Sequence, residues 1–211
     1  GAGGVLAATG VPLRAATPLR AATERPVSDE WDMSWVDRVQ GKYRAVFDSP
    51  EVAEGSAVFR AVMWRNQHQD VYGTAPTDLG AVLVIRHEAI SLAMSDAYWD
   101  RFEIGKQEKL KDPATKKWSR INPVRTAPPG TPPKWAAYNL TSFMASGGIV
   151  LACNMAFGDV VYNFLKKDKL SREDARARAK EQLVPGIILQ PSGIFAALRA
   201  QEAGCNYILA S

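Results

Sequence analysis

Short apolar runs separated by helix-like segments are the feature that most constrains the fold of this chain. The longest, LGAVLVI at Leu79–Ile85, carries no charged or hydroxyl side chain, as is typical of a strand buried on both faces of a parallel sheet. Four shorter runs predict further strands at 42–47, 149–152, 187–189 and 206–209. Five such strands need covering layers on both sides.

Helical periodicity fills the intervals between these runs. Helices are predicted at 51–68, 89–104, 136–146, 159–167, 172–183 and 193–203. Ser171 and Ser192 stand where the last two would have their N-caps. The alternation predicts an α/β fold: a three-layer, doubly wound domain with a five-stranded, mainly parallel sheet. We expect one such domain over residues 28–211.

Residues 105–135 interrupt this alternation. They contain six of the thirteen prolines and eight basic residues against two acidic ones, a local charge of +6 in a chain whose net charge is +4. A long insertion without regular structure is usually functional or an oligomer contact. With Trp118 and Trp135 in it, we interpret it as an extended arm that contacts a partner, with a solvated insertion as the alternative. Nucleic acid is not the expected partner, although basic and aromatic residues alternate here.

The amino-terminal segment, 1–27, is the second appendage. Residues 1–13 are small and uncharged, too few to span a bilayer but suited to the apolar part of an export signal. We interpret the segment as the remnant of a twin-arginine-type signal, or as an extended arm. The first interpretation predicts a periplasmic or otherwise exported protein, with membrane association only through this segment; a cytoplasmic protein is the alternative.

Composition argues against several chemistries. Two cysteines and two histidines, with no Cys-x-x-Cys or His-x-x-x-His spacing, disfavour a disulfide framework and a zinc or haem centre. Neither Gly-x-Gly-x-x-Gly nor Gly-Lys-Ser/Thr occurs, so the phosphate-cradling motifs of common nucleotide folds are missing. We therefore predict no cofactor and no metal.

Cys153 is the strongest candidate for chemistry. It directly follows the run IVLA, and open α/β sheets bind ligands at the carboxyl ends of their strands. The chain then leads into a helix predicted to begin near Asp159, and amide groups at a helix N-terminus favour the reactive thiolate. A buried structural cysteine is the alternative, because a free cysteine packs as a small hydrophobe.

His87 and Cys205 are weaker candidates. His87 follows the strand at Leu79–Ile85 and is expected at the same sheet edge, where it would orient a ligand or exchange a proton with Cys153; a surface or capping role is as consistent with its position. Cys205 precedes the last strand and is predicted to be a buried bystander. A Cys153–Cys205 disulfide stays open at this point, because the sequence gives no distance.

Several blocks of the chain resemble the DsrE/DsrF-like family. They are KYRAVFDSP, LGAVLVIRHEA, GIVLACNMAFGDVV and LVPGIILQPSGIFAALRAQEAGCNYI, and the similarity covers roughly 42–104 and 136–211. The stretch WDMSWVDRVQGKYRAVFDSPE resembles an exported, twin-arginine-bearing branch. The long insertion, and Cys205 where an aromatic residue is usual, depart from the family pattern.

This resemblance implies a three-layer α/β fold, assembly as a homo- or hetero-oligomer (a trimer or hexamer), and sulfur handling. It implies that Cys153 accepts and transfers persulfide sulfur as a sulfur carrier or sulfurtransferase, exchanging it with a protein donor or acceptor, with His87 as a neighbour. The alternative is a non-catalytic oligomeric or accessory subunit that binds partners through 105–135 and the amino-terminal arm. An unidentified small-molecule enzyme is the third possibility.

Overall fold

The computed structural model describes residues 30–128 and 130–211, so the predicted export signal or arm lies outside the described residues. The sheet has five strands, all parallel, in the order β4-β3-β2-β1-β5. Their bounds are β1 Tyr43–Ser49, β2 Leu79–Ile85, β3 Ile149–Cys153, β4 Ile188–Gln190 and β5 Asn206–Leu209. The predicted α/β fold is confirmed, and the sheet is wholly rather than mainly parallel.

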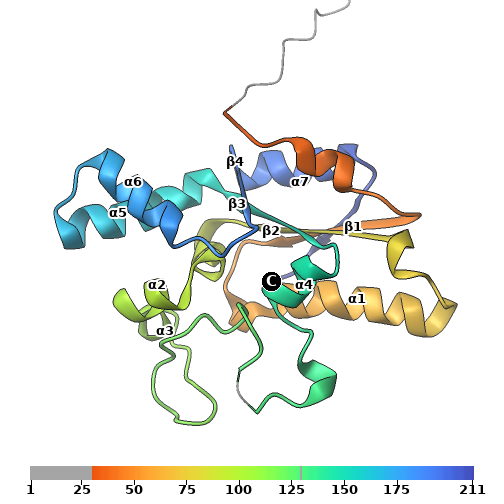
Figure 1. Cartoon of the computed structure of the whole chain (residues 1–211), viewed down its shortest axis with the longest axis horizontal. Helices are drawn as coiled ribbons and strands as arrows, with labels where there is room; N and C mark the ends of the chain where they lie inside the picture. Colours follow the sequence, from red (N-terminus) through yellow and green to blue (C-terminus); the bar gives the residue numbers. More distant parts are fainter. Residues whose placement is uncertain (1–29, 129) are drawn as a thin grey trace, which may run out of the picture.

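Helices cover both faces of the sheet (Figure 1). The α-helices are α1 Ser56–Tyr72, α2 Asp96–Arg101, α3 Ile104–Gln107, α4 Leu140–Ala145, α5 Asn154–Asp168, α6 Arg172–Glu181 and α7 Gly193–Glu202. The 3₁₀ helices are η1 Ser34–Arg38, η2 Ala53–Gly55, η3 Pro76–Asp78, η4 His87–Ala93 and η5 Pro133–Trp135. The described part contains no helix long and apolar enough to cross a membrane.

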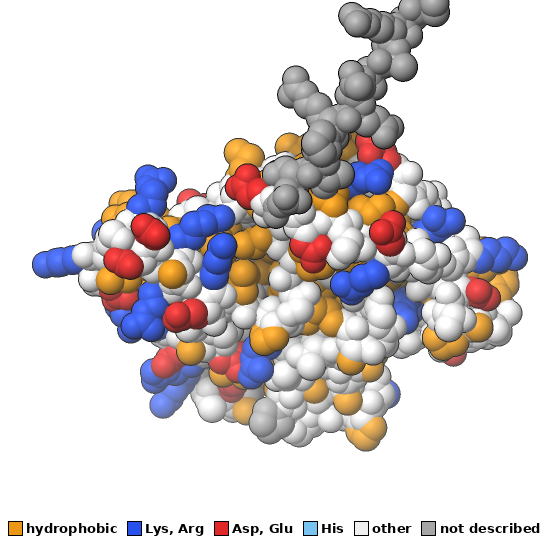
Figure 2. Space-filling model, turned by 45° about the horizontal axis from the view of Figure 1, so that its top comes forward, with side chains coloured by type: hydrophobic (Ala, Val, Ile, Leu, Met, Phe, Trp, Pro, Cys, Tyr) orange, Lys and Arg blue, Asp and Glu red, His pale blue; other side chains and the backbone are white. Residues whose placement is uncertain are grey.

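Two apolar clusters, one on each face, hold the layers together. On one face Phe47, Leu83 and Ile85 of the sheet pack with α1, α4 and α5. On the other face, α7 and η1 cover the sheet, and Trp35 of η1 is completely buried there. β2 is buried along its whole length, as its unbroken apolar sequence predicts. Figure 2 shows basic and acidic side chains mixed over the end formed by α5 and α6.

Four of the differences between the observed and the predicted helices have a clear local reason. α1 begins at Ser56 because Glu54 and Gly55 adopt left-handed backbone conformations. The helix predicted at 89–104 is divided into η4, α2 and α3, with Glu103 in a left-handed conformation between the last two. α4 begins only at Leu140, where the Asn139 side chain accepts the Ser142 N–H. α5 begins five residues earlier than predicted, directly after Cys153.

The insertion is attached to its own domain rather than extended away from it. Asn122 is 2% exposed, and its side-chain amide donates hydrogen bonds to the carbonyl oxygens of Leu92 and Met94, both at 2.7 Å. Val124 is also buried, and a Cβ on Gly55 would lie 1.9 Å from its side chain. In Figure 1 the insertion forms two green loops beneath α3 and α4. The middle of the insertion is therefore part of the core.

Candidate functional site

A cavity of about 480 Å³ opens at the carboxyl ends of β2 and β3. Its walls come from η4, α2, α3 and α5, and from the start of α7, and we refer to it as the Cys153 cavity. It contains both sequence-predicted site residues, Cys153 and His87. The cavity is also lined by Arg86, Glu88, Tyr98, Glu108, Asp159 and Asn163. This is the sheet edge at which open α/β folds bind their ligands.

Cys153 ends β3 and serves as the N-cap of α5. Its Sγ accepts a hydrogen bond from the Ala156 N–H at 3.4 Å, within the range for a sulfur acceptor. The residue is 6% exposed and forms part of the apolar cluster, yet it lines the cavity. Amide donors and the positive end of a helix dipole favour a thiolate over a thiol. Gly158 lies inside α5, not in a loop before it, which places the sulfur at the helix terminus itself.

His87 is exposed and has a left-handed backbone, with φ of 53°. It is the first residue of η4 and follows Arg86, the residue after β2. The Arg86 N–H donates a hydrogen bond to the Ser49 carbonyl at 3.0 Å. Within the described residues, no hydrogen bond joins the His87 ring to Cys153. The two residues share the cavity, as expected from the sheet edge, and His87 lies on its rim rather than as a hydrogen-bonded partner of the thiol.

The acidic and phenolic groups of the cavity were not predicted from the sequence. Glu88, Glu108 and Asp159 all line it, and the pKa of Glu108 is raised, first by burial and then by the Glu88 charge. Burial also raises the pKa of Tyr98 to about 12, partly opposed by the hydrogen bond that its Oη accepts from Asn163 at 2.8 Å. The Cys153 thiol thus faces a cavity whose unpaired charges are negative.

A second feature that was not predicted is an ion pair behind the cavity, between the buried Asp48 and the half-buried Arg86. The Arg86 guanidinium binds both carboxylate oxygens of Asp48 at 2.8 Å, and the Tyr207 hydroxyl donates to Asp48 at 2.6 Å. The hydrogen bond to Asp48 raises the pKa of both Arg86 and Tyr207. These bonds connect the ends of β1, β2 and β5, so Arg86 is committed to the fold and is not a free cation for a ligand.

Gly193 brings α7 against this ion pair. A Cβ at that position would lie 2.4 Å from the Cβ and 2.6 Å from the Cδ of Arg86, closer than packed atoms approach. Ser192 caps the helix by accepting the Phe195 N–H at 3.0 Å, as predicted. The Pro-Ser-Gly turn therefore combines a helix cap with the contact that closes one side of the cavity.

Cys205 lies far from this site, and both cysteines are free thiols. Extending the strand register places Cys205 level with Arg44, at the start of β1, and Cys153 level with Pro50, beyond its end. That offset alone is about 20 Å at ~3.3 Å per residue, which excludes the disulfide left open above. Burial raises the pKa of the Cys205 thiol to about 11, with Arg44 opposing the shift. Cys205 is buried, as predicted.

The second histidine, His68, does not join the cavity. Its ring packs among Tyr43, Trp64 and Tyr72, with ring centroids 4.7 to 5.6 Å away. Across residues 30–128 and 130–211, no group of three histidine, cysteine or acidic side chains is arranged to hold a metal ion.

The fold and the cavity define an α/β protein with a cysteine at the carboxyl edge of a parallel sheet. No protein-family model matches the chain, and no curated protein matches it. One solved structure that matches is a protein of unknown function, MTH1491, from Methanobacterium thermoautotrophicum. It is 16% identical, with 79% of this chain and 98% of that chain covered and a TM-score of 0.37. A similarity this weak carries no conclusion about activity.

Proposed function

We propose that this protein is a sulfur carrier in which Cys153 accepts and passes on persulfide sulfur. The observation that carries the proposal is the position of its Sγ. It lines a cavity of about 480 Å³ and accepts an amide hydrogen bond at the start of α5. Because the sulfur borders the cavity, a small donor that enters it can approach Cys153, and the thiolate is the form of a cysteine that attacks sulfur. The sequence resemblance to DsrE/DsrF-like proteins supports the same conclusion.

The transfer needs no external oxidant or reductant. The Cys153 thiolate attacks the outer sulfur of a donor persulfide, R–S–SH. The sulfur–sulfur bond of the donor breaks, a bond forms between Cys153 Sγ and the transferred sulfur, and the donor leaves as the thiolate R–S⁻. The product, Cys153–S–SH, passes the same sulfur to an acceptor thiolate by the reverse logic. The cavity is larger than one sulfur atom, so it also accommodates the end of the donor side chain or molecule.

Assembly as a homo-oligomer, a trimer or a hexamer, is part of this proposal. The exposed edge strand β5 and helix α7 present apolar side chains to solvent, among them Ile194 at 65% and Leu209 at 57% exposed. An unpaired strand edge with exposed apolar residues is a surface that proteins usually cover. Ile194 also lines the Cys153 cavity, so a partner on this face would lie beside the thiol.

Intact-mass spectrometry tests the sulfur-carrier proposal directly. The protein is incubated with a small-molecule persulfide donor, and the wild type is compared with Cys153→Ser and with Cys205→Ser as the matched control. We expect an adduct of about 32 Da, one sulfur atom, on the wild type and on Cys205→Ser but not on Cys153→Ser. An adduct that persists in Cys153→Ser, or none under conditions that modify an exposed control thiol, contradicts the proposal.

A non-catalytic accessory subunit is the second candidate function. Trp118 and Trp135 of the insertion are 42% and 41% exposed, and exposed tryptophans are typical of interface anchors. Under this proposal Cys153 is a core residue and the insertion binds the partner. Replacing both tryptophans with serine and measuring the oligomer mass by light scattering separates the candidates. A smaller assembly supports the insertion as the contact, and an unchanged mass contradicts it.

A further inference from the structure

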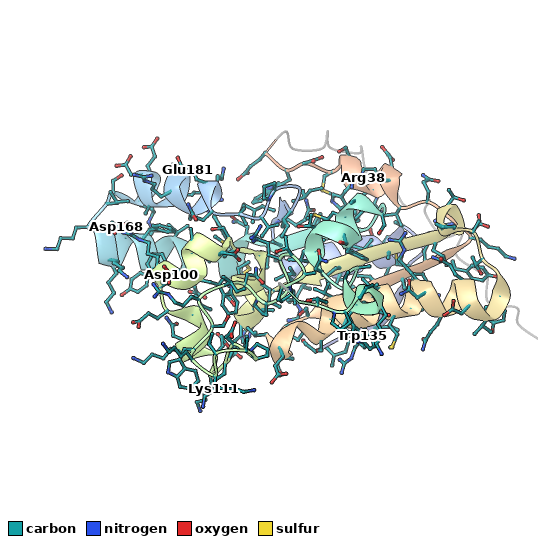
Figure 3. The ribbon with its side chains drawn as sticks, turned by 60° about the horizontal axis from the view of Figure 1, so that its bottom comes forward. Arg38, Asp100, Lys111, Trp135, Asp168 and Glu181 are labelled. Atoms are coloured by element: carbon teal, nitrogen blue, oxygen red, sulfur yellow. The ribbon has the colours of Figure 1, made fainter. Side chains whose placement is uncertain are left out.

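The insertion carries a second cavity, of about 590 Å³, that the proposed sulfur chemistry does not use. It lies between α2, α3 and the loop that follows α3, and we call it the basic pocket. The side chains that line it are Trp99, Asp100, Glu103, Lys106, Lys111, Lys116, Lys117, Trp118, Ser119 and Arg120. Figure 3 shows Lys111 on the loop below α3, pointing away from the sheet, with Asp100 above it. The pocket is distinct from the Cys153 cavity in position and in lining.

Its electrostatic character is one-sided. Five cations face two carboxylates, and one of these, Asp100, is paired with Arg120. The pKa of Asp100 is lowered by that pairing, so both side chains stay ionised. Their opposite charges cancel, and the pair adds no net charge to the lining. The four lysines form no ion pair within the described part of the chain. Glu103 is the one remaining carboxylate, so the lining has a net charge of +3.

The loop that presents three of these lysines is closed by its own backbone. Lys111 and Trp118 form an antiparallel bridge, and the Asp112 N–H donates to the Lys117 carbonyl at 2.8 Å. The Asp112 carboxylate in turn accepts the Thr115 N–H at 2.6 Å. These bonds keep Asp112 ionised, and its charge offsets part of that of Lys116, but Asp112 does not line the pocket, so the lining itself stays net positive. The loop holds like charges together, which costs free energy unless an anion balances them.

The pocket also has a flat apolar wall. The Trp118 ring is 42% exposed, and the Lys111 ammonium lies 5.3 Å from its centroid. Trp99 is buried, and its ring nitrogen is committed to the Ser91 carbonyl at 2.7 Å, so it contributes surface rather than a hydrogen bond. Lysines that line a pocket together with an exposed aromatic ring suit an anion with several charges and a planar substituent.

We propose that the basic pocket binds a small compound with two or more linked phosphate groups. Linked phosphates carry enough negative charge to balance the net +3 of the lining, and a nucleic-acid strand needs a continuous basic groove that extends beyond one pocket of about 590 Å³. Linked phosphates come from two sources, free polyphosphate and the tail of a nucleotide. In the second case the base would stack on Trp118.

Isothermal titration calorimetry with pyrophosphate and with ADP, each on the full chain at low salt, tests this site. The double variant Lys111→Gln/Lys117→Gln is compared with Lys166→Gln/Lys180→Gln, which removes two exposed lysines from α5 and α6. We expect saturable pyrophosphate binding that weakens about tenfold in the first variant and stays unchanged in the second. All four side chains are exposed, so neither variant threatens the fold.

The comparison of the two ligands identifies the source of the phosphates. ADP binding tighter than pyrophosphate, with the difference removed by Trp118→Leu, identifies a nucleotide; equal affinity identifies free polyphosphate. Absence of saturable binding by either ligand, or equal weakening in both lysine variants, overturns the proposal. The sulfur-carrier proposal is unaffected by this outcome, because no residue is shared between the two cavities.

Discussion

The Cys153 cavity and the basic pocket differ in the elements that form them and in the charge of their lining. The first is framed by strand ends and by the starts of α5 and α7, and its unpaired charges, Glu88, Glu108 and Asp159, are negative. The second is framed by a surface loop and two short helices, and its unpaired charges are mostly positive. One cavity is therefore positioned by the sheet itself, and the other by whatever attaches the insertion to the sheet.

The attachment is a short stretch of buried backbone and one amide side chain. Asn122 bonds two carbonyls of η4 and its C-cap, and the Asn122 N–H donates to Asp96 at 3.0 Å. Only a few residues of the insertion are buried, but one of them, Asn122, supplies hydrogen-bond donors to buried backbone carbonyl groups, which need partners. The comparison teaches that a Pro-rich, highly charged segment can be a structural part of a domain when it supplies bonds that the core lacks.

The largest expected effect is on this attachment. Asn122→Ala leaves the Leu92 and Met94 carbonyls buried without donors, and we expect a loss of about 3 kcal/mol in the free energy of unfolding. Denaturant unfolding followed by circular dichroism measures it. Asn206→Ala is the control, because that residue is exposed on β5, and it should change stability by less than about 0.5 kcal/mol. Equal stabilities of the two variants would mean that the insertion is an independent arm.

A second expected effect concerns the wall of the Cys153 cavity. Gly193→Ala forces a Cβ against Arg86, and we expect a loss of about 2 kcal/mol from overpacking. Gly158→Ala is the matched helical control: its Cβ would meet nothing within 4 Å, so this variant should gain about 0.5 to 1 kcal/mol. Thermal unfolding of both variants gives the answer, and a neutral Gly193→Ala would show that α7 does not press on Arg86.

The sequence predicted the sheet far better than the loops. LGAVLVI matches β2 residue for residue, because burial on both faces leaves an unbroken apolar pattern that no surface element imitates. The start of α5 was misplaced because Gly158 suggested a loop, whereas the Cys153 sulfur replaces the usual Ser or Asp as N-cap. Nothing local in the sequence announces that Asn122 is buried, since its partners lie about 30 residues earlier in the chain.

Only part of the candidate site could be predicted from the sequence. Cys153 and His87 follow apolar strands, so their sheet edge could be foreseen. Glu108 and Tyr98 reach the cavity from helices whose orientation depends on tertiary packing, and no spacing rule connects them to Cys153. The pairing of Arg86 with Asp48 joins two strand ends across the sheet. This pairing could not be predicted either, because it too depends on tertiary packing.

The two cysteines give a third comparison. Because the pKa of Cys205 is raised to about 11, about 0.1% of it is thiolate at pH 8, whereas Cys153 has an amide donor on its sulfur. Iodoacetamide at pH 8, followed by peptide mapping, should modify Cys153 at least about tenfold faster in the native protein. Faster modification of Cys205 would contradict the assignment of roles.

The same shift predicts a pH dependence of stability. The folded pKa of Cys205 lies above the ordinary thiol value of 9.0, so the unfolded chain loses its proton first. The free energy of unfolding should therefore fall as the pH rises from about 9 towards 11. Cys205→Ala should flatten this part of the profile, measured by urea unfolding at a series of pH values, while Cys153→Ala should leave the slope in place.

The smallest expected effect concerns the charge of the Cys153 cavity. Burial and Glu88 raise the pKa of Glu108, so the folded state holds that proton more tightly, and ionisation of Glu108 costs stability as the pH rises through its titration. Glu108→Gln should raise the melting temperature slightly at pH 7 and not at pH 3. Glu108 lines the same cavity as the Cys153 sulfur, so removing its negative charge lowers the cost of forming the reactive thiolate, and we expect alkylation of Cys153 to accelerate about twofold. Glu103→Gln is the reciprocal control, because Glu103 lines the basic pocket: it should leave the Cys153 rate unchanged and strengthen pyrophosphate binding. If Glu103→Gln accelerates Cys153 as much as Glu108→Gln does, the two cavities share one electrostatic environment and the contrast between them fails.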